Sequence, residues 1–369
     1  MEHAVYLDHN ATTPIRPEAA DAVGAHLGCV GNPSSVHRYG RIARRTLEEA
    51  RGRVARLVGA RCADVIFTSG GTEANNLALS AGGRIVVSAI EHDSVLGAAG
   101  GARTIPVNAD GIVDLQALDA MLADGADLVS VMLANNETGV VQPVADVAAI
   151  ARRHGALVHC DAVQAAGKIP VEMRALGVHM LSLSAHKLGG PGGVGALVVE
   201  SSLSIEPMLR GGGQEGRRRA GTENVAGIAG FGVAAELAGN GLESFAGLAA
   251  MRDRLERRLA RLAPGAQFFG ASVRRLPNTS CLAAPGLDSE TQVMALDLDG
   301  VAVSAGSACS SGKVSVSHVL EAMGAAGASA AIRVSLGWNS KETDIDRFLD
   351  SWGALHARAA RDPAPLAVA

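Results

Sequence analysis

Aromatic residues are scarce in this sequence, at 3% of 369 residues, so a buried core must be built mainly from Ala, Val, Leu and Ile. No run of 18 or more apolar residues occurs, which argues against a membrane-spanning helix. The formal net charge of -4 provides no overall positive field, so neither nucleic acid nor an anionic membrane is expected as a direct partner. The first residues lack the basic and then apolar layout of a signal peptide, so we expect a cytoplasmic protein.

Cysteine is also rare, and its spacing is not that of a metal site. The five cysteines are far apart, and no CxxC pair occurs. Neither a disulfide framework nor a structural metal site is therefore expected. Cys309 is unusual because it lies in SAGSACSSGK, a run of small and polar residues, whereas most buried cysteines lie among apolar side chains.

The order of the apolar segments predicts an α/β fold. Short strand-like runs alternate with helix-like stretches, a pattern typical of a mostly parallel sheet with helices on both faces. The predicted strands are 64–69, 84–90, 127–133, 156–161, 179–185 and 194–199.

The order changes after a predicted amphipathic helix at 243–263. Strand-like segments at 278–284 and 331–337, separated by a helical segment and the Cys309 segment, suggest a smaller α+β domain. The length also allows two domains. We predict a large domain, 14–250, and a small domain formed by 1–13 and 251–369.

Polar segments follow most of the predicted strands. In an open parallel sheet, ligands bind beyond the carboxyl ends of the strands, so we expect these segments to converge on one crevice. The segments are SGGTEAN (69–75), EHDS (91–94), ANNETG (134–139), DAVQ (161–164) and SAHK (184–187).

Each segment suits a particular role. Gly70, Gly71 and Thr72 stand between a strand and a helix, where free backbone N–H groups favour a phosphate, although an ordinary turn explains the glycines equally well. Asp161 ends an apolar strand, where a carboxylate either pairs with a cation or caps a helix. His92 is either a polar residue at the start of a loop or a group that stacks on a flat ring.

Lys187 completes the set. A single lysine at a strand end is more often solvated, but Lys187 follows Ser184 and His186 and precedes five glycines within seven residues. A lysine in a partly desolvated pocket has a lowered pKa and forms Schiff bases. A phosphate cradle, a buried acid and a lysine in one crevice together suggest pyridoxal 5'-phosphate as cofactor.

Ten segments, in order, resemble the cysteine desulfurases of the class V aminotransferase superfamily, which are pyridoxal-phosphate enzymes of fold type I. The GSACSSGK segment is similar to the nitrogen-fixation and iron–sulfur-cluster branch of that family. The resemblance runs from residue 6 to about residue 350. The segments are YLDHNATTP, GNPSSVHRYG, FTSGGTEANN, EH, NNETGVVQP, HCDAVQ, SAHKLGGPGGVGAL, RAGTEN, GSACSSGK and IRVSLG.

The resemblance implies a role for each matched position. Lys187 would bind the cofactor aldehyde, Asp161 would pair with the pyridine nitrogen, and Gln164 would bond the ring hydroxyl. Arg333 would clamp the substrate carboxylate, a two-pronged contact that suits a guanidinium. The remaining implied contacts are Asn136 near the ring hydroxyl and the substrate, His92 stacked on the ring and active in catalysis, Gly71, Thr72, Ser184 and His186 on the phosphate, and Thr222 on the phosphate of a neighbouring subunit in a homodimer.

The same resemblance implies a function for Cys309. Its thiol would take sulfur from L-cysteine, leaving L-alanine and a persulfide that is passed to a sulfur acceptor or an iron–sulfur scaffold protein. Cys309 could also ligate an iron–sulfur cluster transiently through its persulfide. Three alternatives stay open: a selenocysteine lyase or an aminotransferase on the same fold, and a non-catalytic sulfur-relay scaffold that needs no pyridoxal phosphate.

Overall fold

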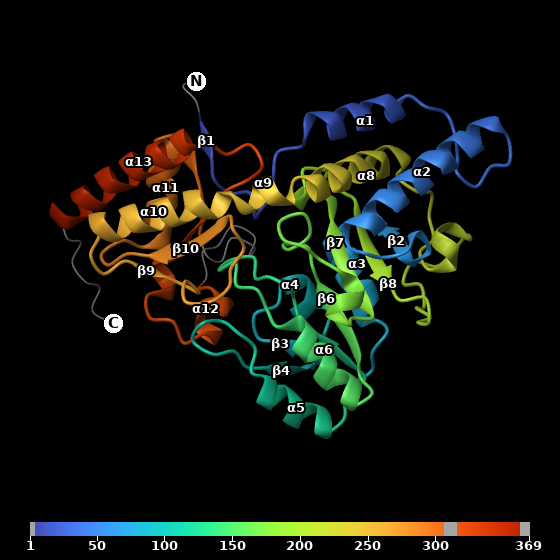
Figure 1. Cartoon of the computed structure of the whole chain (residues 1–369), viewed down its shortest axis with the longest axis horizontal. Helices are drawn as coiled ribbons and strands as arrows, with labels where there is room; N and C mark the ends of the chain where they lie inside the picture. Colours follow the sequence, from blue (N-terminus) through green and yellow to red (C-terminus); the bar gives the residue numbers. More distant parts are fainter. Residues whose placement is uncertain (1–3, 306–315, 362–369) are drawn as a thin grey trace.

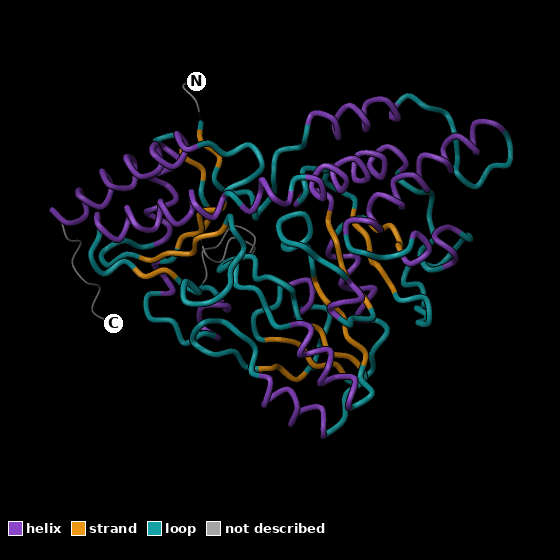
Figure 2. Tube along the Cα trace, viewed as in Figure 1, coloured by secondary structure: helices purple, strands orange, loops and turns teal. Residues whose placement is uncertain are grey.

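The computed structural model describes residues 4–305 and 316–361, so Cys309 lies outside the described residues. The described strands form three sheets, and the two larger ones each have their own helices (Figures 1 and 2). The larger sheet occupies the part of the molecule drawn in blue to yellow-green, and the smaller one the part drawn mainly in orange and red.

The larger sheet has seven strands in the order β2-β8-β7-β6-β5-β3-β4. Only β8 is antiparallel to its neighbours, which confirms the mostly parallel sheet. Six strands match predicted segments, and β4 was not predicted. The strands are β2 (Val65–Thr68), β3 (Ile85–Ser88), β4 (Arg103–Ile105), β5 (Leu128–Ser130), β6 (Leu157–Asp161), β7 (Met180–Ser184) and β8 (Gly195–Val199).

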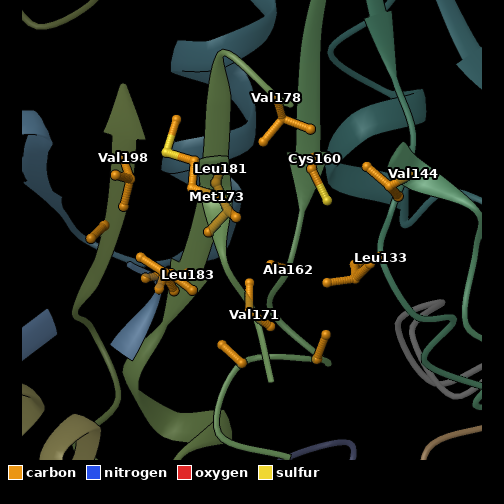
Figure 3. Packing of buried hydrophobic residues seen from close by; sticks show 14 of the residues in the cluster. Leu133, Val144, Cys160, Ala162, Val171, Met173, Val178, Leu181, Leu183 and Val198 are labelled. Carbon is orange, nitrogen blue, oxygen red and sulfur yellow. The ribbon is translucent and has the colours of Figure 1, made fainter. Parts of the chain in front are cut away.

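Hydrophobic cores cover both faces of this sheet, which is why its strands are almost continuously apolar. In β2, Val65 and Phe67 belong to one core, whereas Ile66 between them belongs to the other. The first core, part of which is shown in Figure 3, includes side chains of α2 (Arg38–Leu57), α5 (Leu115–Ala123), α6 (Val144–Arg153) and α8 (Val225–Asn240). The second includes side chains of α3 (Gly71–Leu79) and α4 (Asp93–Leu96).

The smaller sheet has the order β12-β13-β10-β9, and a parallel pair of strands, β1 and β11, lies apart from it. Its separate core includes Leu7, Leu255, Phe348 and Trp352. The elements of this part are β1 (Val5–Tyr6), β9 (Gln267–Phe268), β10 (Thr279–Ala283), β11 (Val301–Ala302), β12 (Ser304–Ala305), β13 (Ile332–Ser335), α10 (Leu248–Leu262), α11 (Ser289–Leu298), α12 (His318–Ala322) and α13 (Glu342–Arg361).

The remaining helices are α1 (Pro17–Leu27), α7 (Met173–Leu176) and α9 (Leu242–Ala246). The single helix predicted at 243–263 is interrupted at Gly247, which ends α9 and precedes α10. Glycine has a weak preference for helix, which explains the interruption. Among the described helices, none is by itself long and apolar enough to cross a membrane, although the bent pair Val225–Asn240 and Leu242–Leu262 meets that test of length and composition together.

Candidate active site

A cavity of about 380 Å³ lies at the carboxyl-end edge of the larger sheet, within the ~300–1,000 Å³ range of small-molecule sites. The strands β2, β3, β5, β6 and β7 all run in the same direction, so the polar segments that follow them meet at this edge. Except for Thr222, every described residue of the predicted site lines the cavity.

Lys187 reaches the cavity from the short helical turn Ala185–Lys187 that follows β7. Its Nζ donates to the carbonyl oxygens of Asn10, at 2.5 Å, and Ala11, at 2.6 Å. These carbonyls belong to the N-terminal segment, which runs between the two sheets. The amine is therefore held at a fixed position on the cavity wall.

Asp161 is the last residue of β6 and is 7% exposed. Its Oδ2 accepts a hydrogen bond from Asn75 Nδ2 at 2.7 Å, and its Oδ1 accepts one from the Val163 N–H at 2.9 Å. The structure thus supplies an oriented carboxylate at the cavity.

The first turn of α3 gives the cavity its anion-binding features. The backbone N–H groups at a helix N-terminus and the helix dipole favour a phosphate. A Cβ on Gly71 would lie 3.0 Å from Val163 Cγ2 and 3.5 Å from Ser184 Cβ, so only glycine fits there without displacing a neighbour. Thr72 follows directly, and the buried Ser184 ends β7 beside this turn.

Two histidines line the cavity. His186 Nδ1 lies 3.1 Å from Thr12 Oγ1, and burial, together with the charge of Lys187, lowers the pKa of His186 to about 4. His186 is therefore neutral at physiological pH. The His92 side chain caps α4: its Nδ1 accepts a hydrogen bond from the Ser94 N–H at 3.0 Å, so in the neutral ring Nε2 carries the proton.

Arg333 enters the cavity from β13 of the smaller sheet, with 2% of its surface exposed. Its Nη2 donates to Asp8 Oδ1 at 2.7 Å, and its Nη1 donates to the Asn136 carbonyl oxygen at 2.9 Å. Its buried Nε has no hydrogen-bond partner. Because Arg333 lines the cavity, its guanidinium brings a positive charge to the side of the cavity that faces the smaller sheet.

These residues fit pyridoxal phosphate. The cavity wall contains an amine for the aldehyde, a carboxylate for a protonated pyridine nitrogen, and a helix N-terminus whose glycine leaves room for a phosphate. Gln164 adds an amide for the ring oxygen. No set of three or more metal-ligating side chains occurs among the described residues.

The structure also shows residues that sequence analysis missed. Asn10 connects the two sheets: its Nδ2 donates to Thr279 Oγ1 and to the Asn136 carbonyl oxygen, and its own carbonyl oxygen accepts from Lys187. Asn75 holds Asp161. Both residues lie inside segments used for the family resemblance, YLDHNATTP and FTSGGTEANN, but no pattern in one sequence indicates which polar residue of a segment faces the site.

Thr222 is exposed and does not line the cavity of its own chain. Nearby, Arg219 Nε donates to Glu73 Oε1 at 2.9 Å, which ties the segment that precedes Thr222 to the first turn of α3. The predicted nucleophile Cys309 falls among residues 306–315, outside the described ranges.

Comparison with known proteins gives consistent matches over nearly the whole chain. Residues 5–348 match the family model of class-V aminotransferases. The chain is 45% identical over 365 residues to a cysteine desulfurase of Cereibacter sphaeroides, covering 94% of each chain. A NifS-like protein from Rickettsia africae superposes with a TM-score of 0.90 at 37% identity, covering 96% of this chain and all of the other. A structure of SspA in complex with cysteine superposes with a TM-score of 0.78 at 28% identity, covering 90% and 98%.

Proposed function

The chain belongs to the class-V aminotransferase family and, within it, to the cysteine desulfurases, and from this premise we propose that it removes sulfur from L-cysteine with pyridoxal 5'-phosphate. The products are L-alanine and a persulfide on Cys309. The observation that supports this most strongly is the convergence of Lys187, Asp161, Arg333 and the first turn of α3 on one cavity. The related SspA structure in complex with cysteine supports the choice of substrate.

When bound, pyridoxal phosphate supplies an electron sink that makes the α-proton of an attached amino acid acidic. Lys187 Nζ would hold the aldehyde of the bound cofactor and would serve as the base for the α-proton of the substrate. The carbonyl oxygens of Asn10 and Ala11 hold Nζ in place for both roles. Asp161, fixed by Asn75 and Val163, keeps a proton on the pyridine nitrogen.

The other side chains of the cavity bind the phosphate and the ring of the cofactor and the carboxylate of the substrate. The N–H groups at Gly71 and Thr72, with the Ser184 hydroxyl and the neutral His186, bind the phosphate. Gln164 and Asn136 would hold the ring oxygen, and His92 would contact the ring. The guanidinium of Arg333, which lines the cavity, binds the substrate carboxylate.

Cys309 completes the reaction as the nucleophile. Its thiolate attacks the sulfur of the bound cysteine, so that an S–S bond forms and the substrate Cβ–S bond breaks. The bonding electrons of the broken bond stay with Cβ, which takes up a proton and becomes the methyl group of alanine. L-cysteine and the enzyme thiol therefore become L-alanine and the enzyme persulfide, with no further oxidant or reductant.

We also propose a sulfur acceptor, a homodimer, a division into two domains and a compartment for this protein. The persulfide passes its sulfur to an acceptor protein for iron–sulfur cluster assembly or other sulfur delivery. Two chains form a homodimer in which the exposed Thr222 reaches the phosphate in the partner subunit. Residues 14–250 form the cofactor-binding domain, and 1–13 with 251–369 form the small domain. The described cysteines are free thiols, which fits a reducing compartment such as the cytoplasm.

Three proteins test the proposal: the wild type, Cys309→Ala and Lys187→Ala, each incubated with L-cysteine and a thiol reductant. The wild type should release equal amounts of alanine and sulfide. Cys309→Ala should keep the visible absorbance of the bound cofactor and release no sulfide, whereas Lys187→Ala should lose turnover. Sulfide release by Cys309→Ala at the wild-type rate would overturn the proposed nucleophile, and a colourless wild type would favour a non-catalytic relay.

A further inference from the structure

Lys168 is a second buried lysine behind the active site, and the proposed reaction does not use it. It lies in the turn that follows β6, four residues after Gln164, and is 4% exposed. Its Nζ donates to Gln164 Oε1 and to Asn10 Oδ1, each at 2.8 Å. Both acceptors are neutral amide oxygens, which is unusual for a buried amine, since buried charges in proteins are normally paired.

The groups that surround Lys168 make its protonated form costly. Burial, the charge of Lys187 and the charge of Arg333 all lower the pKa of Lys168 well below its usual value. His9 also faces it and is itself mostly neutral, because burial and the charge of Lys168 lower the pKa of His9 to about 4. The two hydrogen bonds to Gln164 and Asn10 are the contacts that hold the amine in these surroundings.

Those contacts determine which way the Gln164 amide points. Gln164 Oε1 accepts from Lys168, and one hydrogen of Gln164 Nε2 is donated to the Asn10 carbonyl oxygen at 2.9 Å. A primary amide has two N–H hydrogens, so one stays available to a ligand in the cavity that Gln164 lines. With the amide turned over, the oxygen would face the Asn10 carbonyl, and Lys168 would lose its acceptor.

Lys168 also reaches the catalytic amine indirectly. It bonds the side chain of Asn10, whose backbone carbonyl accepts from Lys187 Nζ at 2.5 Å. Asn278 Nδ2 donates to the same Asn10 Oδ1 at 3.1 Å, so Lys168 and the smaller sheet hold Asn10 together. The Lys168 amine thus contacts Gln164 and Asn10, the two residues that lie between it and the cavity.

We propose that Lys168 is a positioning residue, which holds the Gln164 amide with an N–H directed at the ring oxygen of pyridoxal phosphate. This inference rests on the proposed function only in placing that cofactor in the cavity. A hydrogen bond donated to the ring oxygen weakens the bond that this oxygen accepts from the protonated nitrogen joining Lys187 to the cofactor. Loss of the donor therefore lets that nitrogen keep its proton to higher pH.

The test measures the pH midpoint of the visible absorbance change of the holoenzyme without cysteine. The proteins are wild type, Lys168→Met, Gln164→Leu and the double variant, with exposed Lys341→Met as the control. Lys168→Met should raise the midpoint by about one pH unit, because a shift of that size corresponds to the free energy of about one hydrogen bond. It should cause no further shift in the Gln164→Leu background, because the two residues act as one unit. Lys341→Met should leave the midpoint unchanged.

An unchanged midpoint in Lys168→Met, or an equal rise in the Gln164→Leu background, would overturn the inference. A purely structural role would lower the thermal unfolding temperature of the cofactor-free protein and leave the midpoint where it is. If Lys168→Met yields no folded protein, Lys168→Gln takes its place in the same comparison. A wild type that binds the cofactor but makes no alanine overturns only the proposed function, whereas one that takes up no cofactor overturns both.

Discussion

Asn75 Nδ2 donates to Asp161 Oδ2 at 2.7 Å, which joins helix α3 to the end of β6. The same Nδ2 donates to Ser94 Oγ at 2.9 Å, and Asn75 is 1% exposed. The bond therefore connects the two features on which a phosphate-bearing cofactor depends: the helix N-terminus for the phosphate and the carboxylate for the ring nitrogen.

Replacing Asn75 with Ala should weaken cofactor binding. Hydrogen bonds to charged groups contribute about 1.5–3 kcal/mol, so we expect the Kd for pyridoxal phosphate to rise by roughly tenfold or more. Fluorescence titration of the cofactor-free protein measures this Kd. Asn76→Ala is the matched control, because the Asn76 side chain bonds only backbone carbonyls of Thr72 and Ser94. Equal Kd values for the two variants would show that Asn75 does not support Asp161.

Replacing Arg333 with Lys should affect substrate binding more than turnover. Lysine is a point charge and cannot form the two-pronged contact of a guanidinium with a carboxylate. We expect KM for L-cysteine to rise by about tenfold or more, with a smaller change in kcat. Arg275→Lys is the control, because Arg275 is a similarly buried arginine that pairs with Glu256. An unchanged KM in Arg333→Lys would remove Arg333 from the substrate site.

Glu91 predicts a pH-dependent change in stability. The side chain is fully buried, and burial raises its pKa to about 8. Because the folded pKa exceeds the unfolded value of 4.5, the contribution of Glu91 to stability is present below pH 4.5 and is lost as pH rises toward 8. Glutamine does not titrate, so Glu91→Gln should not lose this stability as the pH rises. The difference in Tm between Glu91→Gln and wild type should therefore increase from pH 5 to pH 8, and a constant difference would contradict the assignment.

Gly337 should not tolerate a side chain. A Cβ at this position would lie 1.8 Å from His9 Nδ1, whose ring is fixed by Thr13 Oγ1 at 2.6 Å. We expect Gly337→Ala to lose about 1–3 kcal/mol of stability through overpacking, which thermal unfolding measures as a lower Tm. Gly24→Ala, in the exposed helix α1 with no atom within 4 Å, should leave Tm unchanged or raise it slightly. If both variants unfold at the same temperature, His9 moves aside at no cost.

The sequence predicted the large sheet well because its strands are buried on both faces and read as short apolar runs. Six strands of that sheet were predicted, whereas β4 (Arg103–Ile105), at the sheet edge, has only three residues and no apolar run. The two-residue strands β1, β9, β11 and β12 were missed for the same reason.

The site shows a similar limit. Strand direction explains why polar segments meet, and the segments themselves were visible in the sequence. The hydrogen bonds of Asn10, Asn75 and Lys168 depend instead on how the N-terminal segment, α3 and the turn after β6 pack together. Lys168 in particular stands in GKIP, which one sequence gives no reason to place beside a catalytic lysine.

The most direct test of the account is a single turnover of the wild-type holoenzyme with L-cysteine in the absence of reductant, followed by alkylation and mass spectrometry of its peptides. We predict one added sulfur atom on the peptide that contains Cys309, in an amount equal to the alanine formed. Alanine formed with no added sulfur on that peptide, or with the sulfur on Cys29 or Cys62, the two exposed thiols among the described cysteines, would contradict it.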